Sequence, residues 1–200
     1  MNHQNHHVVD RHFYTAAVEF CQMRNMRQII LVSLDEALLL PDADQDGIEH
    51  MRTRVNAMIK SQCRAITKKL TKTLIRIRGS DFHTADCCFH KPSPVNPRIE
   101  EHCVPVGMIH KRVIGLLTYL EEPELLAVGP LSAFFFIKEN FIIADVTVEQ
   151  NKTLLPANGM PPGWDWLNPN KMLRYEQANP LVAYFPLGGC EHCNHLGGLL

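Results

Sequence analysis

Two cysteines near the end of the sequence have the spacing of metal ligands. Cys190 and Cys193 form a C-x2-C pair, in which two thiolates can bind one Zn²⁺ ion. A closed structural zinc site needs two further ligands, and we expect Cys87 and His90 to supply them. They belong to a central group of Cys and His that also contains His83, Cys88, His102 and Cys103. Because the sequence has no second C-x2-C pair, small buried cysteines without a metal are the alternative.

Catalytic chemistry has weaker support in the residue pattern. Asp81, His83, Asp86 and Cys87 include the residue types of a carboxylate, a base and a nucleophile, but closeness in sequence does not establish their geometry. The sequence contains no G-x-S-x-G motif, no phosphate-binding glycine loop with lysine and no H-E-x-x-H motif. A zinc-dependent enzyme that uses the central Cys and His residues and the C-terminal C-x2-C pair is therefore the alternative to a non-enzymatic protein.

An acidic turn over residues 42–47 has the pattern of half a calcium loop. Asp42, Asp44 and Asp46 alternate before Gly47, as the first carboxylate ligands and the glycine of such a loop do. The twelfth position is Thr53, where a bidentate glutamate is required. Calcium binding is therefore not expected, and these residues favour an acidic cap at the start of the following helix.

Basic side chains are concentrated in residues 52–78, which contain nine Lys and Arg and no Asp or Glu. Lys60, Arg64, Lys68 and Lys72 recur at every fourth position, so in a helix they form one ridge, and their mutual repulsion predicts a negative surface against them. The hypothesis we develop is an acidic surface on a partner protein. The alternatives are a solvated face neutralised by the chain's own carboxylates, and nucleic acid, against which the net charge of −1 argues.

Length and composition indicate one globular core with an appendage. A chain of 200 residues, with 46% hydrophobic and 20% charged residues, is long enough for one domain and short for two. No apolar run reaches the roughly 18–20 residues that cross a bilayer, and the first ten residues are polar where a secretory signal is apolar. The seven cysteines are odd in number and irregularly spaced, which favours a reducing compartment. We therefore expect a cytoplasmic protein without a membrane span.

Hydrophobic periodicity predicts an α+β fold of about three main helices packed on a small, mainly antiparallel sheet. The predicted helices cover residues 10–25, 48–70 and 105–120. The predicted strands cover residues 28–33, 74–78, 131–138 and 141–149, of which the last two form a hairpin. Residues 79–104 are predicted to be an ordered loop. Residues 1–150 are expected to form the domain, and residues 151–200 a proline- and glycine-rich extension packed on it.

The extension contains both tryptophans of the chain, Trp164 and Trp166. They are expected either to plug the core or to serve as exposed binding anchors. Together with Arg52 and the basic ridge, they lead to a hypothesis for function. The protein is expected to be a non-enzymatic adaptor or chaperone-like subunit of a larger cytosolic assembly, which binds acidic partner proteins through the basic helix and the aromatic tail. Nucleic-acid binding is a second alternative.

Overall fold

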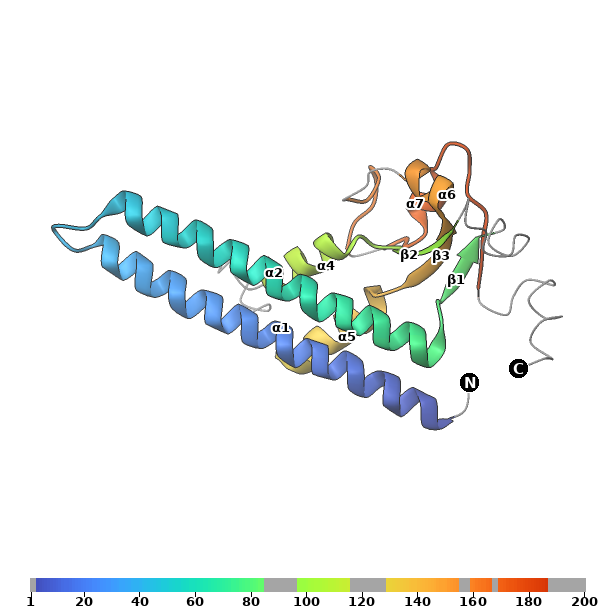
Figure 1. Ribbon diagram of the computed structural model, residues 1–200, viewed down its shortest axis with the longest axis horizontal. Coiled ribbons are helices and arrows are strands. Elements are labelled where there is room, and N and C mark those ends of the chain that lie inside the picture. Colours follow the sequence, from blue (N-terminus) through green and yellow to red (C-terminus); the bar gives the residue numbers. More distant parts are fainter. Residues whose placement is uncertain (1–2, 85–96, 116–128, 155–158, 167–168, 187–200) are drawn as a thin grey trace. The chain divides into compact units, whose positions relative to one another are not determined.

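The computed structural model describes residues 3–84, 97–115, 129–154, 159–166 and 169–186 (Figure 1). They form a mixture of helices and strands, which confirms the α+β class. The chain divides into two compact units. We call one the helical unit (Met1–Thr73 and His110–Ile137) and the other the strand unit (Leu74–Ile109 and Lys138–Leu200).

The helical unit begins with one continuous helix, α1 (His3–Leu38), which contains the predicted helix over residues 10–25. The predicted strand over residues 28–33 is wrong, because the helix continues through it. No glycine or proline interrupts residues 3–40, so nothing stops the helix at this apolar run. Ile29 and Val32 in the run are 68% and 47% exposed, so it is not the buried strand that its composition favoured. Four consecutive apolar residues do not by themselves distinguish a strand from a helix.

The predicted long amphipathic helix is confirmed and extends beyond both predicted ends as α2 (Gln45–Arg78). Its buried apolar residues keep the three-four spacing seen in the sequence: Ile48, Ile59, Cys63, Ile66, Leu70 and Leu74. The predicted strand over residues 74–78 is wrong, because the helix continues to Arg78. Gly79 has a φ of 74°, in the left-handed region that glycine adopts readily at helix ends.

α2 starts at the acidic turn, where Asp44 caps it. The Asp44 carboxylate accepts a hydrogen bond of 3.0 Å from the Gly47 amide, and Asp46 lies in the first helical turn. The hydrogen bond satisfies an amide that the helix itself leaves without a partner, and the carboxylates lie at the positive end of the helix dipole. The interpretation of this turn as a helix cap is therefore confirmed.

Asp44→Ala is expected to lower the free energy of unfolding by about 1 kcal/mol, because the Gly47 amide loses its acceptor. Asp42→Ala is the matched control, since Asp42 is an exposed residue of the same turn. It removes the same charge and leaves the cap in place. Urea denaturation followed by far-ultraviolet circular dichroism measures both variants. Equal losses would mean that the charge of the turn, and not the cap, stabilises α2.

Two shorter helices follow in the sequence and contribute residues to both units. α4 (Val106–Gly115) confirms the predicted helix after Pro105 as far as residue 115, and residues 116–120 of that prediction lie outside the described residues. α5 (Pro130–Asn140) occupies the place of the predicted strand over residues 131–138. No helix in the described part of the chain is long and apolar enough to cross a membrane.

α5 shows that the predicted hairpin of two strands is wrong in its first half. Pro130 stands at the first helical position, where proline is favoured. Ala133 and Ile137 are buried four residues apart, while Leu131 and Phe135 are each 59% exposed. This is the burial period of a helix, and it is hidden in the sequence because apolar residues occupy both its buried and its exposed face.

The strand unit is built on a four-stranded sheet with the order β2-β3-β1-β4. The strands are β1 (Phe82–Thr84), β2 (Arg98–His102), β3 (Ile143–Thr147) and β4 (Tyr184–Pro186). β1 and β3 are parallel, while β2 with β3 and β1 with β4 are antiparallel. β3 confirms the second strand of the predicted hairpin. β1 and β2 lie in the segment predicted as a loop, because strands this short leave almost no periodic signal.

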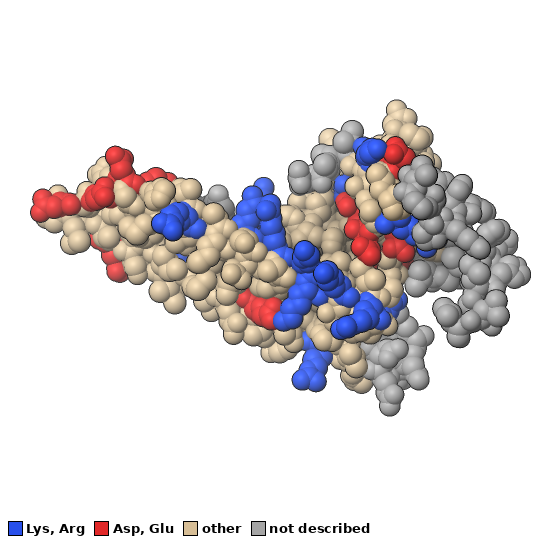
Figure 2. Space-filling model, viewed as in Figure 1, with Lys and Arg blue, Asp and Glu red and all other residues tan. Residues whose placement is uncertain are grey.

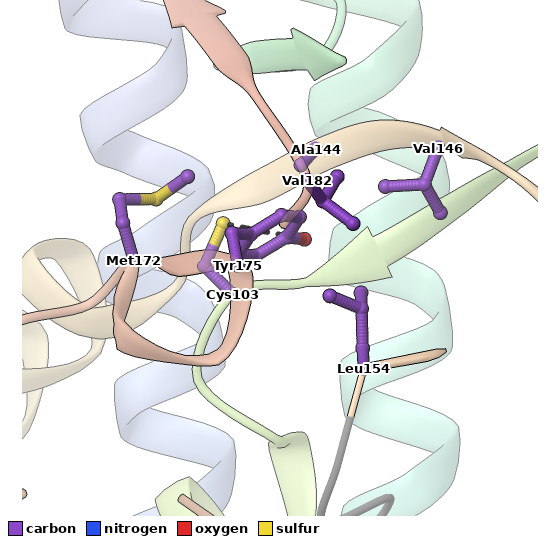
Figure 3. Close-up of a cluster of buried hydrophobic side chains, with 7 residues drawn as sticks. All are labelled: Cys103, Ala144, Val146, Leu154, Met172, Tyr175 and Val182. Atoms are coloured by element: carbon purple, nitrogen blue, oxygen red, sulfur yellow. Dashed lines mark hydrogen bonds between the residues drawn. The ribbon is translucent and has the colours of Figure 1, made fainter. Parts of the chain in front are cut away.

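A cluster of buried side chains forms the core of the strand unit (Figure 3). Ala144 and Val146 contribute to it from β3. Two short helices, α6 (Val148–Thr153) and α7 (Leu173–Glu176), bring further parts of the chain to the same core. The remaining members of the cluster are Cys103, Leu154, Met172, Tyr175 and Val182. Segments far apart in the sequence therefore depend on one another for burial.

Candidate interaction surface

α1 and α2 run side by side in opposite directions and form a helical hairpin (Figure 1). Ion pairs join them along its length. Lys69 Nζ lies 3.1 Å from Glu19 Oε1, and Arg52 pairs with Asp35 near the turn. Arg52, one of the predicted partner-binding residues, therefore has its charge balanced inside the hairpin, and 27% of its side chain is exposed.

The four residues of the predicted ridge are all exposed on α2: Lys60, Arg64, Lys68 and Lys72. In the described part of the helical unit, none of them lies within ion-pair distance of a carboxylate. Figure 2 shows Lys and Arg side chains gathered along this stretch of α2. A solvated cationic ridge of this kind attracts anionic partners and raises the rate at which they associate.

The alternative to a partner is neutralisation of the ridge by the chain's own carboxylates, for which the candidates are the six Asp and Glu of residues 121–149. Three of them have contacts within the strand unit: Glu139 with Lys171, Glu149 with Lys152, and Asp145 with Ser80. The other three lie outside the described residues: Glu121, Glu122 and Glu124. The described residues therefore provide no pairing that neutralises the ridge in its own unit.

Negative charge is concentrated at the turn between α1 and α2. Residues 35–49 contain six Asp and Glu and no Lys or Arg. Figure 2 shows acidic side chains together at this end of the hairpin, and Asp46 and Glu49 are exposed on the first turns of α2. The sequence interpretation assigned this turn to a cap and missed the charge polarity of α2. The signal for this charge polarity is that residues 35–49, shortly before Arg52, contain acidic residues and no basic ones.

The hairpin buries little apolar surface between residues 22 and 58, all of which the structure describes. Only Leu34 and Ile48 are buried in this stretch. Six large apolar side chains are at least 40% exposed there: Ile29, Val32, Leu39, Leu40, Met51 and Met58. Two helices with so few buried side chains gain little stability from packing on each other. These exposed apolar side chains are accessible to another molecule.

A small hollow lies between α1 and α2 within the helical unit. Its lining includes His12, Glu19 and Lys69, and its volume is about 30 Å³. A space of this size accommodates a water-sized molecule, whereas ligand sites for metabolites occupy hundreds of Å³. The hollow is therefore too small to be a binding site for a metabolite.

The two tryptophans of the predicted aromatic tail lie in the strand unit and contact each other. The ring centroids of Trp164 and Trp166 are 4.6 Å apart in an edge-to-face arrangement, which is favourable for aromatic pairs. Both side chains are half-buried. Their partial burial does not distinguish a plug on the core from a binding anchor, and the role of Trp164 and Trp166 as anchors stays a prediction.

The four predicted zinc ligands lie outside the described residues: Cys87, His90, Cys190 and Cys193. In the part of the chain that is described, no group of three or more Cys, His, Asp and Glu is arranged to hold a metal ion. Cys103, another candidate ligand, is fully buried, and its Sγ donates to the Tyr175 hydroxyl at 3.9 Å. Burial raises the pKa of the Cys103 thiol to about 12, so this thiol is protonated at neutral pH.

The described members of the candidate catalytic group have structural contacts in the strand unit. Asp81 Oδ2 accepts a hydrogen bond of 2.9 Å from the Ile143 amide, and Asp81 Oδ1 lies 2.6 Å from Arg78. Asp81 thus joins the end of α2 to β3. His83 is buried on β1, and burial lowers its pKa, which favours the neutral imidazole. The other two members lie outside the described residues: Asp86 and Cys87.

Comparison of the chain with known protein families, with curated proteins and with solved structures finds no match. The surface chemistry of the described residues is therefore the basis for a functional proposal.

Proposed function

We propose that this protein is a non-enzymatic adaptor or chaperone-like subunit of a cytosolic assembly, which binds an acidic surface of a partner protein with the α1–α2 hairpin. The observation that carries the proposal is the exposed ridge from Lys60 to Lys72, which has no ion pair in the described part of its own unit. One cation per helical turn is complementary to a partner element with regularly spaced carboxylates. Such complementarity selects partners and guides their approach.

Charge alone does not hold such a complex together. Exposed ion pairs contribute about 0.2–1 kcal/mol each, because water and salt screen them. Apolar contact contributes about 25 cal/mol for each Å² removed from water. Ile29, Val32 and Met51 offer exposed apolar surface on the same hairpin. In this proposal the ridge orients the partner, and the apolar side chains contribute most of the binding free energy, with Trp164 and Trp166 as a second contact.

A helical peptide with glutamate at every fourth position is expected to bind the protein more tightly than a scrambled peptide of the same composition. Charge reversal by Lys60→Glu, Arg64→Glu and Lys68→Glu together is expected to weaken binding of the matched peptide at least about tenfold, because attraction becomes repulsion. Arg54→Glu is the matched control, since Arg54 is exposed on α2 and lies outside the ridge. Fluorescence anisotropy of the labelled peptides measures these affinities.

Two results would count against the proposal. One is equal affinity for the matched and scrambled peptides, and the other is unchanged binding by the triple variant. A DNA duplex is the third probe in the same assay. Tighter binding of the duplex than of the peptide, with affinity that falls steeply with salt and is lost in the triple variant, would assign the ridge to nucleic acid.

A further inference from the structure

One exposed stripe on α2 changes from negative to positive along the helix. Its members follow three-four spacing, which places them on one face of the helix. They are Asp46, Glu49, Thr53, Ala57, Lys60, Arg64 and Lys68. Each of these residues is exposed. The stripe therefore has carboxylates at its N-terminal end, cations at its C-terminal end and small side chains in the middle.

We infer that this stripe binds a second copy of the same chain, with the two α2 helices antiparallel. Asp46 and Lys68 are each eleven residues from Ala57, or about 16 Å along the helix axis. A two-fold axis beside Ala57 therefore places Asp46 opposite the partner's Lys68, and by symmetry Lys68 opposite the partner's Asp46. The same operation brings Glu49 next to the partner's Arg64.

The stripe fits a second copy because it is complementary to itself in only one orientation. Antiparallel pairing sets each carboxylate against a cation, whereas parallel pairing sets like charges against each other. A two-fold axis uses the same patch on both copies, which is the commonest symmetry of protein dimers. Ala57 lies beside this axis, Lys60 three residues from it and Thr53 four residues from it. The short side chains of Ala57 and Thr53 allow the two helix axes to approach closely.

The inference rests on the proposed function, because it names one acidic partner of the ridge as the turn of another copy. The proposed dimer leaves other parts of the hairpin accessible to other proteins. The helical period places Met51 and Met58 on a different side of α2 from the stripe. Those exposed apolar side chains can contact a different protein while the stripe holds the dimer.

The dimer is expected to dissociate readily and to respond to salt. The stripe contains no large apolar side chain, so its stability depends on exposed ion pairs. The Debye length falls from about 10 Å at 0.1 M salt to about 3 Å at 1 M, which removes most of the attraction between such charges. We expect dimers at low salt and monomers at high salt for the same protein concentration.

Sedimentation velocity of the full chain at low salt tests the inference with charge-swapped variants. Asp46→Lys with Glu49→Lys is expected to be monomeric, because its stripe is then entirely basic. Arg64→Glu with Lys68→Glu is expected to be monomeric, because its stripe is then entirely acidic. An equimolar mixture of the two is expected to form a dimer, since each basic stripe faces an acidic one. The control Arg54→Glu is expected to dimerise as the native protein does.

Ala57→Arg is a further variant that leaves both charged ends intact. It places a long, charged side chain beside its own symmetry mate, so it is expected to be monomeric at low salt. Circular dichroism establishes that each variant keeps its helices. The inference is overturned by a native protein that is monomeric at low salt, by a dimer that persists in Ala57→Arg, or by a mixture of folded swapped variants that stays monomeric.

The peptide assay separates failure of the inference from failure of the proposed function. If the native protein is monomeric and still binds the matched acidic peptide through the ridge, the proposed function is retained and the proposed dimer is rejected. If the native protein neither dimerises nor distinguishes the matched peptide from the scrambled one, both the proposed dimer and the proposed function are rejected.

Discussion

Arg174→Ala is expected to lower the free energy of unfolding of the strand unit by about 3 kcal/mol, because it removes a buried guanidinium that pairs with the partly exposed Glu101 and donates to two carbonyl groups. Arg174 is 1% exposed on α7, and its Nη1 donates to Glu101 Oε1 at 2.7 Å. The guanidinium also donates to the carbonyl groups of His102 and Leu154, each at 3.2 Å. Alanine leaves a carboxylate without its counter-charge and two carbonyl groups without a donor.

Urea denaturation followed by tryptophan fluorescence measures this loss, because both tryptophans of the chain lie in the strand unit. Lys152→Ala is the matched control. It removes the partner of Glu149 in an ion pair whose side chains are 65% and 71% exposed. That change is expected to cost less than about 1 kcal/mol, because water replaces the lost contact. Similar small losses in both variants would mean that Arg174 does not hold this unit together.

Acid is expected to destabilise the helical unit by about 3 kcal/mol between pH 6.5 and pH 4, because unfolding releases a buried neutral imidazole to take up a proton. His110 is 8% exposed, contacts the Thr67 hydroxyl and lies with its ring centroid 5.5 Å from that of Phe20. Burial, assisted by the nearby charge of Arg64, lowers the pKa of His110 to about 4. The unfolded chain binds this proton near pH 6.5, so the stabilisation is complete above that pH and is lost as the pH falls toward 4.

His110→Gln isolates this contribution, because glutamine retains a hydrogen-bonding side chain toward Thr67 and does not titrate. Urea denaturation of both proteins at pH 7 and pH 4 gives the comparison. The free energy of unfolding of the native protein is expected to fall by about 3 kcal/mol more than that of the variant. An equal fall in both would assign the acid sensitivity to other groups, such as His83, whose pKa burial also lowers.

The hydrophobic pattern alone is sufficient to predict an element in which it repeats over many turns. α2 could be predicted because its buried residues, such as Ile59, Cys63 and Ile66, repeat over many turns, and only a helix places such a series on one face. The three strand predictions that failed concern residues 28–33, 74–78 and 131–138. Each is short, and each is helical in the structure. No glycine or proline separates residues 28–33 and 74–78 from the helices that contain them, whereas in residues 131–138 apolar side chains on both faces of α5 hide the helical period.

The candidate surface could be predicted in part. The exposure of Lys60 and Lys68 follows from their place opposite the apolar face of one helix. The sequence does not reveal which basic side chains already have partners. Arg52 pairs with Asp35 over 17 residues of sequence, and Lys69 pairs with Glu19 over 50. Such pairs depend on how two helices lie against each other, which local periodicity does not encode.

By itself, the sequence determined the apolar face of α2 and the acidic cap at its start, because each of these depends on residues within a few helical turns. Only the tertiary structure decided that β1 pairs with β3 and that Arg174 is buried against Glu101, a residue 73 positions away in the chain. Contacts of this kind become favourable only when distant segments bury one another. The physical reason is that packing depends on distance in space, whereas periodicity reports only the distance along the chain.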